Sequence, residues 1–365
     1  MTWNRTYRPK TIAQLHLVKV RERLSGLLKQ SALPQAFLFA GPKGTGKTSA
    51  SRILAAVLND PKNTKGVLER IQSTSQNQSP QSVLLEPSLD DDFISRILEG
   101  KSYVVHELDA ASNRGIDDIR NLKERVFLPP QEGVVSVFIL DEAHMLTTEA
   151  SNALLKILEE PPAHVVFILA TTELHKILPT IISRCYTVEF SKASDSEILS
   201  ALTTIMDAEK LTYELDALQA IIALADGSFR DAVKLAESVS VKEKKLTLLA
   251  VSEQLGVANI SKEIDSLLRS IISKEANTVV AIFSDFRKSA IPEKVLYTQL
   301  LTRLHSLLVS TLLGTNAHVE WSAPIIQFLL AEFSTIEVTQ MCPIPYLALE
   351  LKCLDIISRS QKKKF

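Results

Sequence analysis

The chain has 365 residues, enough for two or three domains of ordinary size and a sizeable hydrophobic core. Hydrophobic residues make up 45% of it and glycine only 11 residues, which excludes collagen-like and low-complexity classes and favours a helix-rich globular protein. Because 41 basic residues stand against 42 acidic ones, the net charge is −1, and any contact with nucleic acid must come from a local basic patch.

Three cysteines, Cys185, Cys342 and Cys353, form no CxxC pair, which excludes a four-cysteine zinc site. Few, unpatterned cysteines fit a reducing cytosol. No run approaches the ~20 apolar residues of a membrane span, and residues 1–5 lack the apolar core of a signal peptide. We therefore expect a cytoplasmic protein with no zinc and no membrane partner.

The first half of the chain alternates apolar runs with helical patterns. Buried strands are predicted at Ala36–Ala40, Val134–Leu140 and Val165–Ala170, and an amphipathic helix at Lys47–Leu58. Continuous apolar strands separated by helices indicate an α/β fold with a parallel sheet covered on both faces. Residues 72–82, which hold four Gln and four Ser, have the composition of a loop or a disordered segment.

The second half has no convincing strand from Ser191 onward. Helical spacing runs through Glu197–Met206, Glu214–Ala225, Asp231–Val239 and several later segments. We predict an all-helical second half that divides near residues 242–245.

The strongest motif is GPKGTGKT, from Gly41 to Thr48, which fits G-x-x-x-x-G-K-[ST] between a predicted strand and a predicted helix. Gly44 and Gly46 let backbone N–H groups close around phosphate oxygens, at the positive end of a helix dipole. Lys47 can reach β- and γ-phosphates, and the Thr48 hydroxyl can bind Mg²⁺. The alternative is a glycine turn with a chance lysine, which the strand–turn–helix context disfavours.

A second motif, FILDEAH, ends a predicted strand in Asp141 and Glu142, at the sheet edge where α/β folds bind ligands. Asp141 would hold Mg²⁺, and Glu142 would polarise an attacking water molecule. The alternative is a solvated strand end or helix start, which the glycine loop makes less favourable. We interpret His144 as a surface or packing residue without a catalytic role.

Three further polar residues follow these elements. Thr172 follows the predicted strand Val165–Ala170 and could sense a γ-phosphate, while Arg184 could stabilise charge on a transferring phosphoryl group. In isolation each is equally a strand end or a surface arginine, and Arg230 at a helix start could simply pair with an acid. A loose basic set (Arg114, Arg120, Lys123, Arg125 and Lys156) is interleaved with acids, so a solvated helix face remains its alternative.

Taken together, these segments resemble the AAA+ clamp-loader ATPases, most of all the gamma/tau type of bacterial DNA polymerase III. The resemblance covers about residues 5–60 and 104–240, with the motifs in the right order. The matching segments are GPKGTGKT, LDAASNRGIDDIR (Leu108–Arg120), FILDEAHML (Phe138–Leu146), NALLKILEEPP (Asn152–Pro162), ILATT (Ile168–Thr172), SRC and GSFRDA (Gly227–Ala232). The last third matches only in length and helical character.

The resemblance implies an AAA+ α/β domain over residues 1–190 with an atypical insertion at about 59–105. A helical lid over 191–241 and a helical collar over 242–365 would follow. The function implied is that of a DNA-stimulated ATPase that loads a sliding clamp onto primer–template DNA. The partners implied are the clamp, the DNA and other loader subunits (delta, delta-prime and further gamma copies). Since no long tail follows, the short gamma form is expected.

The resemblance also implies roles for individual residues. Glu142 and Thr172 would serve catalysis in the same chain, and Arg184 in the active site of a neighbouring subunit. Thr48 and Asp141 would hold Mg²⁺, and Arg114, Arg120 and Lys156 would face DNA. The implied ATP-binding residues are Gly41, Pro42, Lys43, Gly44, Thr45, Gly46, Lys47, Thr48, Ser49, Arg230, Arg8 and Pro9.

The sequence departs from the family in two places. The family's four-cysteine zinc module is absent between Asn59 and His106, and Asp91 and Ile94 stand about where two ligands would be. The usual Gly-Gln is replaced around residues 16–18, and Ile12 replaces an expected Phe, which weakens the case for adenine contacts there. The alternatives are a non-hydrolysing delta-prime-like subunit, another AAA+ DNA-processing ATPase, and an interaction protein that binds ATP only structurally.

Overall fold

The computed structural model describes residues 2–72, 83–240, 245–254, 257–289, 293–313, 322–336 and 344–362. The chain divides into two compact units, Met1–Lys245 and Leu246–Phe365. Most of the Gln/Ser-rich stretch (73–82) lies outside the described residues, as do residues 241–244, near the predicted division of the helical half.

The first unit is built on a five-stranded parallel sheet with strand order β2-β3-β4-β1-β5. Its strands are β1 (Ala36–Ala40), β2 (Val105–Asp109), β3 (Ser136–Asp141), β4 (Val165–Thr171) and β5 (Tyr186–Glu189). The three strands predicted from the sequence are the central ones, β1, β3 and β4, so the predicted α/β class with a parallel sheet is confirmed. The edge strands β2 and β5 were not predicted, because their half-exposed side chains break the apolar run that marks a buried strand.

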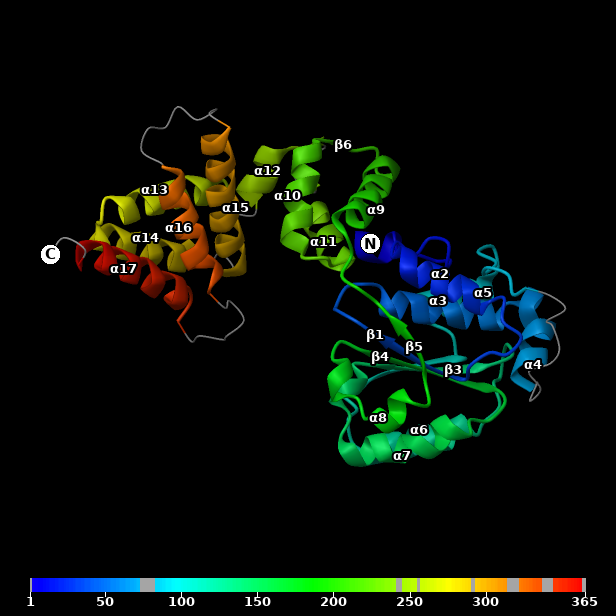
Figure 1. The fold of residues 1–365 in the computed structure, drawn as a ribbon. Coiled ribbons are helices and arrows are strands. Elements are labelled where there is room, and N and C mark those ends of the chain that lie inside the picture. The colour runs from blue at the N-terminus through cyan, green and yellow to red at the C-terminus, as the bar shows by residue number, and fades with distance from the viewer. Residues whose placement is uncertain are drawn as a thin grey trace. The chain divides into compact units, whose positions relative to one another are not determined.

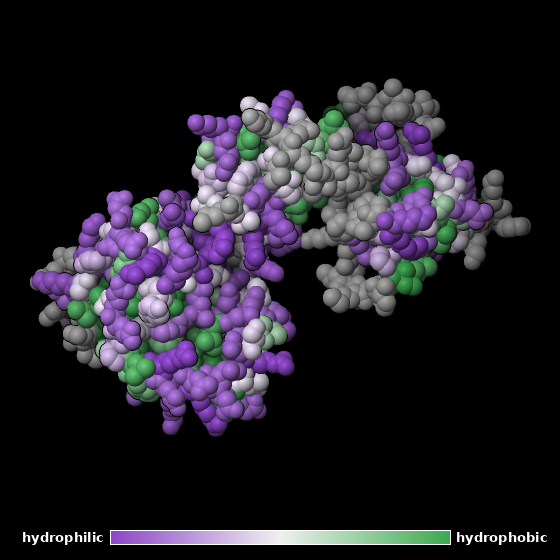
Figure 2. Space-filling model, turned by 180° about the vertical axis from the view of Figure 1, so that it is seen from behind, coloured by the Kyte–Doolittle hydropathy of each residue, from purple (hydrophilic) through white to green (hydrophobic). Residues whose placement is uncertain are grey.

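Helices cover both faces of the sheet (Figure 1). On one face lie α2 (Val18–Leu27), α3 (Lys47–Asn59) and α5 (Asp92–Glu99), and on the other α6 (Ile116–Val126), α7 (Thr148–Glu159) and α8 (Pro179–Ile182). Because side chains alternate along a strand, Leu38, Phe138 and Phe167 join the core beneath α6 to α8. On the outside of this domain, Figure 2 shows small hydrophobic patches scattered over a mostly hydrophilic surface.

The predicted insertion contains a 3₁₀ turn, η1 (Pro61–Asn63), helix α4 (Thr64–Gln72) and α5. Buried polar side chains at its start fix the described segment that precedes α5. Asn63 exchanges two hydrogen bonds of 2.8 Å with the backbone of Leu85, and the Ser88 N–H donates to Asp60 Oδ2 at 2.6 Å. These bonds satisfy groups that would otherwise be buried without partners.

Asp91 and Ile94, the positions compared with zinc ligands, serve the helix α5 in this structure. The Asp91 carboxylate accepts the N–H groups of Phe93 and Ile94 as an N-cap, and the Ile94 side chain is fully buried. Among the residues that the structure describes, no group of three or more His, Cys, Asp and Glu side chains could hold a metal ion.

Helices α9 (Asp195–Ala208), α10 (Leu215–Ala225) and α11 (Phe229–Ser240) follow the sheet in the same unit. Helices α9 and α11 contain their predicted helical segments, and α10 begins one residue after the predicted start at Glu214. A capping box of Ser194 with Glu197 begins α9. The short N-terminal helix α1 (Trp3–Thr6) packs against α11. The expectation of no strand after Ser191 is wrong at β6 (Thr212–Tyr213) and β7 (Lys245–Leu246), since two-residue strands carry no readable period.

The second unit is helical apart from the end of β7, within its described residues. Its helices are α12 (Leu248–Gln254), α13 (Val257–Ile272), α14 (Ala276–Ser289), α15 (Glu293–Leu312), α16 (Ala323–Ser334) and α17 (Leu347–Lys362). They enclose a core that includes Phe283, Phe286, Phe333 and Tyr346. No helix among the described residues is both long and apolar enough to cross a membrane.

Candidate active site

A cavity of 730 Å³ opens at the carboxyl end of the sheet, within the first unit. Its walls come mainly from the N-terminal segment, the loop between β1 and α3, the end of β3, and the helices α9 and α11, with Val20 of α2 and Phe190 after β5. Of the residues predicted to bind a nucleotide, those lining it are Arg8, Pro9, Lys43, Gly44, Thr45, Gly46, Lys47, Thr48, Ser49 and Arg230. Asp141 and Glu142 line it too, whereas Gly41, Pro42, Thr172 and Arg184 do not.

Two glycines let the loop after β1 take its course. Gly44 has φ +78°, and a Cβ there would overlap the hydroxyl of Ser228, just before α11. A Cβ on Gly41 would overlap the carbonyl oxygen of Phe190. The loop is therefore packed closely against two other segments, and neither glycine can be replaced without moving them.

Lys47 is the first residue of α3, and its side chain lies inside the loop. Its Nζ donates to the carbonyl oxygens of Gly41 at 2.7 Å and Pro42 at 2.9 Å, and the residue is only 7% exposed. Burial lowers its pKa, an effect opposed by the nearby carboxylates of Glu142 and Asp141. A cation held in a glycine-rich loop at a helix N-terminus is suited to binding phosphate oxygens.

The Thr48 hydroxyl and the Asp141 carboxylate meet in front of this loop. Thr48 Oγ1 donates to Asp141 Oδ2 at 3.0 Å, while Asp141 Oδ1 accepts the N–H of Glu142 at 2.9 Å. Hydroxyl and carboxylate oxygens are ligands of the kind that Mg²⁺ prefers. Magnesium usually takes one or two protein oxygens and completes its shell with water and phosphate, so this pair fits such an ion.

Glu142 is held by a residue of the next strand. Thr172, just after β4, donates its hydroxyl to Glu142 Oε2 at 3.1 Å. Glu142 itself has φ +48°, an uncommon backbone conformation for glutamate, and it precedes the 3₁₀ turn η2 (Ala143–Met145). The pairing of Glu142 with Thr172 comes from the adjacency of β3 and β4 in the sheet, which the sequence predicts only through the order of its motifs.

His144, interpreted from the sequence as a surface or packing residue, lies within this cluster. Its side chain is only 7% exposed, with Nδ1 3.1 Å from Thr171 Oγ1 and 3.6 Å from Glu142 Oε2. The available signal was its position two residues after Glu142, where a tight turn brings it back beside the carboxylate.

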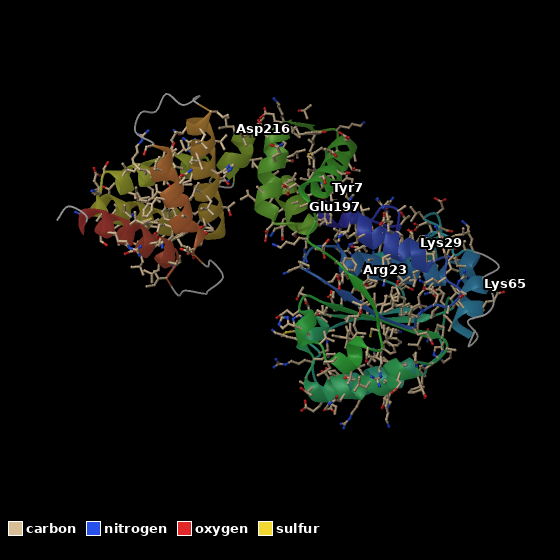
Figure 3. The ribbon with its side chains drawn as sticks, in the orientation of Figure 1. Tyr7, Arg23, Lys29, Lys65, Glu197 and Asp216 are labelled. Atoms are coloured by element: carbon tan, nitrogen blue, oxygen red, sulfur yellow. The ribbon has the colours of Figure 1, made fainter. Side chains whose placement is uncertain are left out.

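The N-terminal segment and helices α9 and α11 close the other side of the cavity. Tyr7, after α1, donates its hydroxyl to Glu209 Oε1 at 2.7 Å, and the N–H of Val18 donates to Glu197 Oε1 at 3.1 Å. Figure 3 labels Tyr7 and Glu197 at this junction. The Glu209 hydrogen bond, with burial and the carboxylate charge, raises the pKa of Tyr7 to about 12. The segment therefore connects the sheet to the helices that follow it.

Two places where the sequence departs from the family lie in this segment. The His16 ring lies 5.1 Å from the ring of Phe229 at the start of α11, and both residues line the cavity. The fully buried Ile12 is fixed through its backbone, since its N–H donates to Glu86 Oε2 at 2.8 Å. The cavity contacts of His16 and Phe229 were not predicted from the sequence.

Arg230 and Arg184 lie in different surroundings. The backbone N–H of Arg230 donates to Gly44 O at 3.4 Å, so α11 begins against the glycine loop. Arg184 follows α8 and donates to Thr180 O at 2.8 Å and Glu159 Oε1 at 3.1 Å. Within one chain, the structure does not bring Arg184 to the cavity that Arg230 lines.

The predicted DNA-facing residues lie on or beside α6 and α7, which pack against each other (Figure 1). Arg114, Arg120 and Lys156 are all exposed. Arg120 pairs with Asp117 at 2.9 Å, and the Arg114 carbonyl accepts the N–H of Thr147 at 3.1 Å. None of the three lines the cavity.

The strand order, the glycine loop with its buried lysine, and the paired carboxylates at the end of the inner strand β3 define a P-loop domain of the AAA+ ATPase class. Comparison with known proteins places the chain among the subunits of DNA polymerase III. The family model described as DNA polymerase III, delta subunit, matches residues 17–194.

Two individual relatives identify the type of subunit more specifically. The tau subunit of Bacillus subtilis DNA polymerase III is 37% identical over 272 residues, which cover 71% of this chain and 44% of the relative. The gamma subunit of Buchnera aphidicola is 31% identical over 306 residues, 82% of this chain and 76% of the relative. The chain therefore belongs to the gamma/tau family of DNA polymerase III subunits. It spans about half the length of several tau and gamma/tau relatives.

Among solved structures, the Holliday junction branch migration motor RuvB of Thermotoga maritima matches with a TM-score of 0.48 at 18% identity, over 77% of this chain and 85% of that one. The family assignment rests on the sequence relatives.

Proposed function

We propose that this chain is the ATP-hydrolysing subunit of a DNA polymerase III clamp loader, which places a sliding clamp on primer–template DNA. ATP binding would organise several subunits into a spiral that holds the clamp open, and DNA would trigger hydrolysis and release. The observation that carries the proposal is the meeting of the loop cation Lys47 with the carboxylates of Asp141 and Glu142 beside one cavity.

The contacts of the site support a division of labour among its residues. The backbone of residues 41–49 would surround the triphosphate, with Lys47 at its β- and γ-phosphates. A magnesium ion held by Thr48 and Asp141 would neutralise charge on the phosphate oxygens. Glu142, oriented by Thr172, would polarise the attacking water.

The remaining binding residues come from the walls of the cavity. Arg8 and Pro9 would lie beside the adenine, and Arg230 would bring the lid to the phosphates of the same chain. Arg184, held away from its own cavity, would act on the nucleotide of a neighbouring subunit.

The chain would act as one subunit of a larger assembly. The chain would assemble with delta, delta-prime and further gamma copies, and with the sliding clamp. Arg114, Arg120 and Lys156 would contact the DNA backbone by charge. The α/β domain would cover residues 1–190, the lid 191–241 and an oligomerising collar 242–365. The protein would bind no zinc.

A delta-prime-like subunit that does not hydrolyse ATP is the second candidate, because the matching family model is described as a delta subunit. The intact set of Lys47, Thr48, Asp141 and Glu142 around the cavity favours the motor instead. An interaction protein that merely contains ATP would have no need of a water-polarising carboxylate.

An ATPase assay with and without primed DNA and clamp tests the proposal, in the complex with its partner subunits. We expect turnover that DNA stimulates. Lys47→Ala should abolish nucleotide binding, because the loop amides cannot replace the cation. Glu142→Gln should keep binding and lose hydrolysis, whereas the control Glu149→Gln, on the exposed start of α7, should change neither. A wild-type complex that binds ATP without turning it over would favour the delta-prime-like alternative.

A further inference from the structure

A buried histidine lies beside the carboxylate that the proposed function assigns to water activation. The His144 ring is held at both nitrogens, by Thr171 Oγ1 at 3.1 Å from Nδ1 and by Glu173 Oε1 at 3.3 Å from Nε2. Its side chain is 7% exposed, in contrast with 76% for His175 in the same region. The ring therefore has one location, fixed from two sides.

The partners of His144 are themselves fixed. Thr171 is fully buried at the end of β4, and its hydroxyl also accepts the N–H of Glu173 at 3.0 Å. Glu173 precedes the turn η3 (Leu174–Lys176) and pairs with Lys176 at 2.7 Å. The histidine, in the turn after β3, is thereby anchored to the end of β4 and to the residues that follow it, which makes it a rigid support.

The Glu142 carboxylate lies against this support. Its Oε2 is 3.6 Å from His144 Nδ1 and accepts the Thr172 hydroxyl at 3.1 Å. One carboxylate oxygen is thus held between a hydroxyl and an imidazole. A general base must keep its reacting oxygen within hydrogen-bond reach of the proton that it removes.

We propose that His144 is a positioning residue for Glu142. With Thr172, it restricts the carboxylate to the orientation in which it can polarise water, and it touches no substrate itself. The inference rests on the proposed ATPase function. Because a displacement of about 1 Å in a catalytic group can cost roughly 100-fold in rate, loss of this support should lower turnover by about 10- to 100-fold.

The test compares His144→Ala, His144→Asn and His144→Gln in the complete complex, with steady-state ATPase kinetics and a fluorescent ATP analogue for affinity. The Asn amide nitrogen stands near the place of Nδ1, beside Thr171 and Glu142, whereas the Gln amide nitrogen stands near the place of Nε2, beside Glu173. We expect kcat to be highest in the Asn variant, lower in the Gln variant and lowest in the Ala variant. KM and nucleotide affinity should stay within about twofold of wild type. The matched control is His175→Ala, which removes the exposed histidine beside Glu173 and should behave as wild type.

A double variant shows whether the histidine acts through Glu142. In the Glu142→Gln background, the slow residual hydrolysis is measured over hours with excess enzyme, and His144→Ala should lower it by less than about twofold, because residues that act as a unit are not additive. Equal losses of rate in both backgrounds would overturn the proposal. So would wild-type kcat in His144→Ala, equal rates in the Asn and Gln variants, or a loss confined to affinity. Absence of turnover in the wild-type complex would instead overturn the proposed function, and this inference with it.

Discussion

Arg184 gives the sharpest test of how neighbouring subunits would cooperate. Its guanidinium forms an ion pair with Glu159 at 3.1 Å, and the two side chains are 31% and 57% exposed. An exposed pair of this kind contributes about 0–1 kcal/mol, so Arg184→Ala should fold normally and lose less than about 1 kcal/mol of unfolding free energy. Arginines that reach a neighbour's nucleotide are worth ~10³–10⁵ in turnover. We therefore expect a variant that is stable, binds ATP normally and has lost DNA-stimulated hydrolysis.

The assay mixes Arg184→Ala chains with Lys47→Ala chains in one assembly and measures ATP turnover with primed DNA and clamp. Each variant alone should be inactive, whereas mixed assemblies should recover activity at interfaces that join an intact loop lysine to an intact arginine. Arg96→Ala is the matched control, because it removes an arginine from a similarly exposed pair with Glu132. No recovery in verified mixed assemblies, or full activity of Arg184→Ala alone, would refute the reasoning.

Three further predictions concern the stability and chemistry of the chain. The side chain of Asn59 is 1% exposed and makes hydrogen bonds of 2.8–3.1 Å to Ala55 O, Val134 N and both backbone groups of Val135. In urea unfolding, Asn59→Ala should therefore lower the free energy of unfolding by about 3 kcal/mol, and the exposed control Asn152→Ala by less than about 0.5 kcal/mol. Equal losses in the two variants would contradict this prediction. Elemental analysis after a chelator wash should find no stoichiometric zinc. The chelator should also leave the melting temperature unchanged, because Asn63, Asp60 and Asp91 fix the insertion by hydrogen bonds. A content of about one zinc per chain would refute this prediction. The Tyr7 pKa is raised to about 12, so the hydrogen bond of the neutral phenol to Glu209 stabilises the fold fully below the ordinary pKa of 10.0 and is lost as pH rises towards 12. The titration of Tyr7 is followed as the phenolate absorbance of the wild type minus that of Tyr7→Phe. A midpoint near pH 10 in this difference would disprove the Glu209 bond.

The central elements could be predicted because local rules and tertiary burial agree there. The runs that form β1, β3 and β4 are apolar at nearly every position, since both faces of these strands are covered. The edge strands lack that signature: β2 reads Val-His-Glu-Leu-Asp, in which three of the five residues are polar and only Val105 is buried. An edge strand is recognised by its partner, and the partner is known only from the fold.

The chemistry of the candidate site divides in a similar way. Lys47, Thr48 and the pair Asp141–Glu142 belong to short contiguous motifs, whose residue types and spacing already specify a phosphate-binding loop beside acidic residues. Their meeting at one edge follows from parallel strands that end together. The sequence by itself thus determined the fold class and the charged centre of the site.

Only the tertiary structure decided which side chains surround that centre. His144 lies two residues from Glu142, yet its position depends on Thr171 at the end of β4 and on Glu173 just after that strand. His16 and Phe229 line the same cavity from segments more than two hundred residues apart. Contacts of this kind leave no local pattern, because they are made when helices and strands pack, and a motif records only what its own backbone brings together.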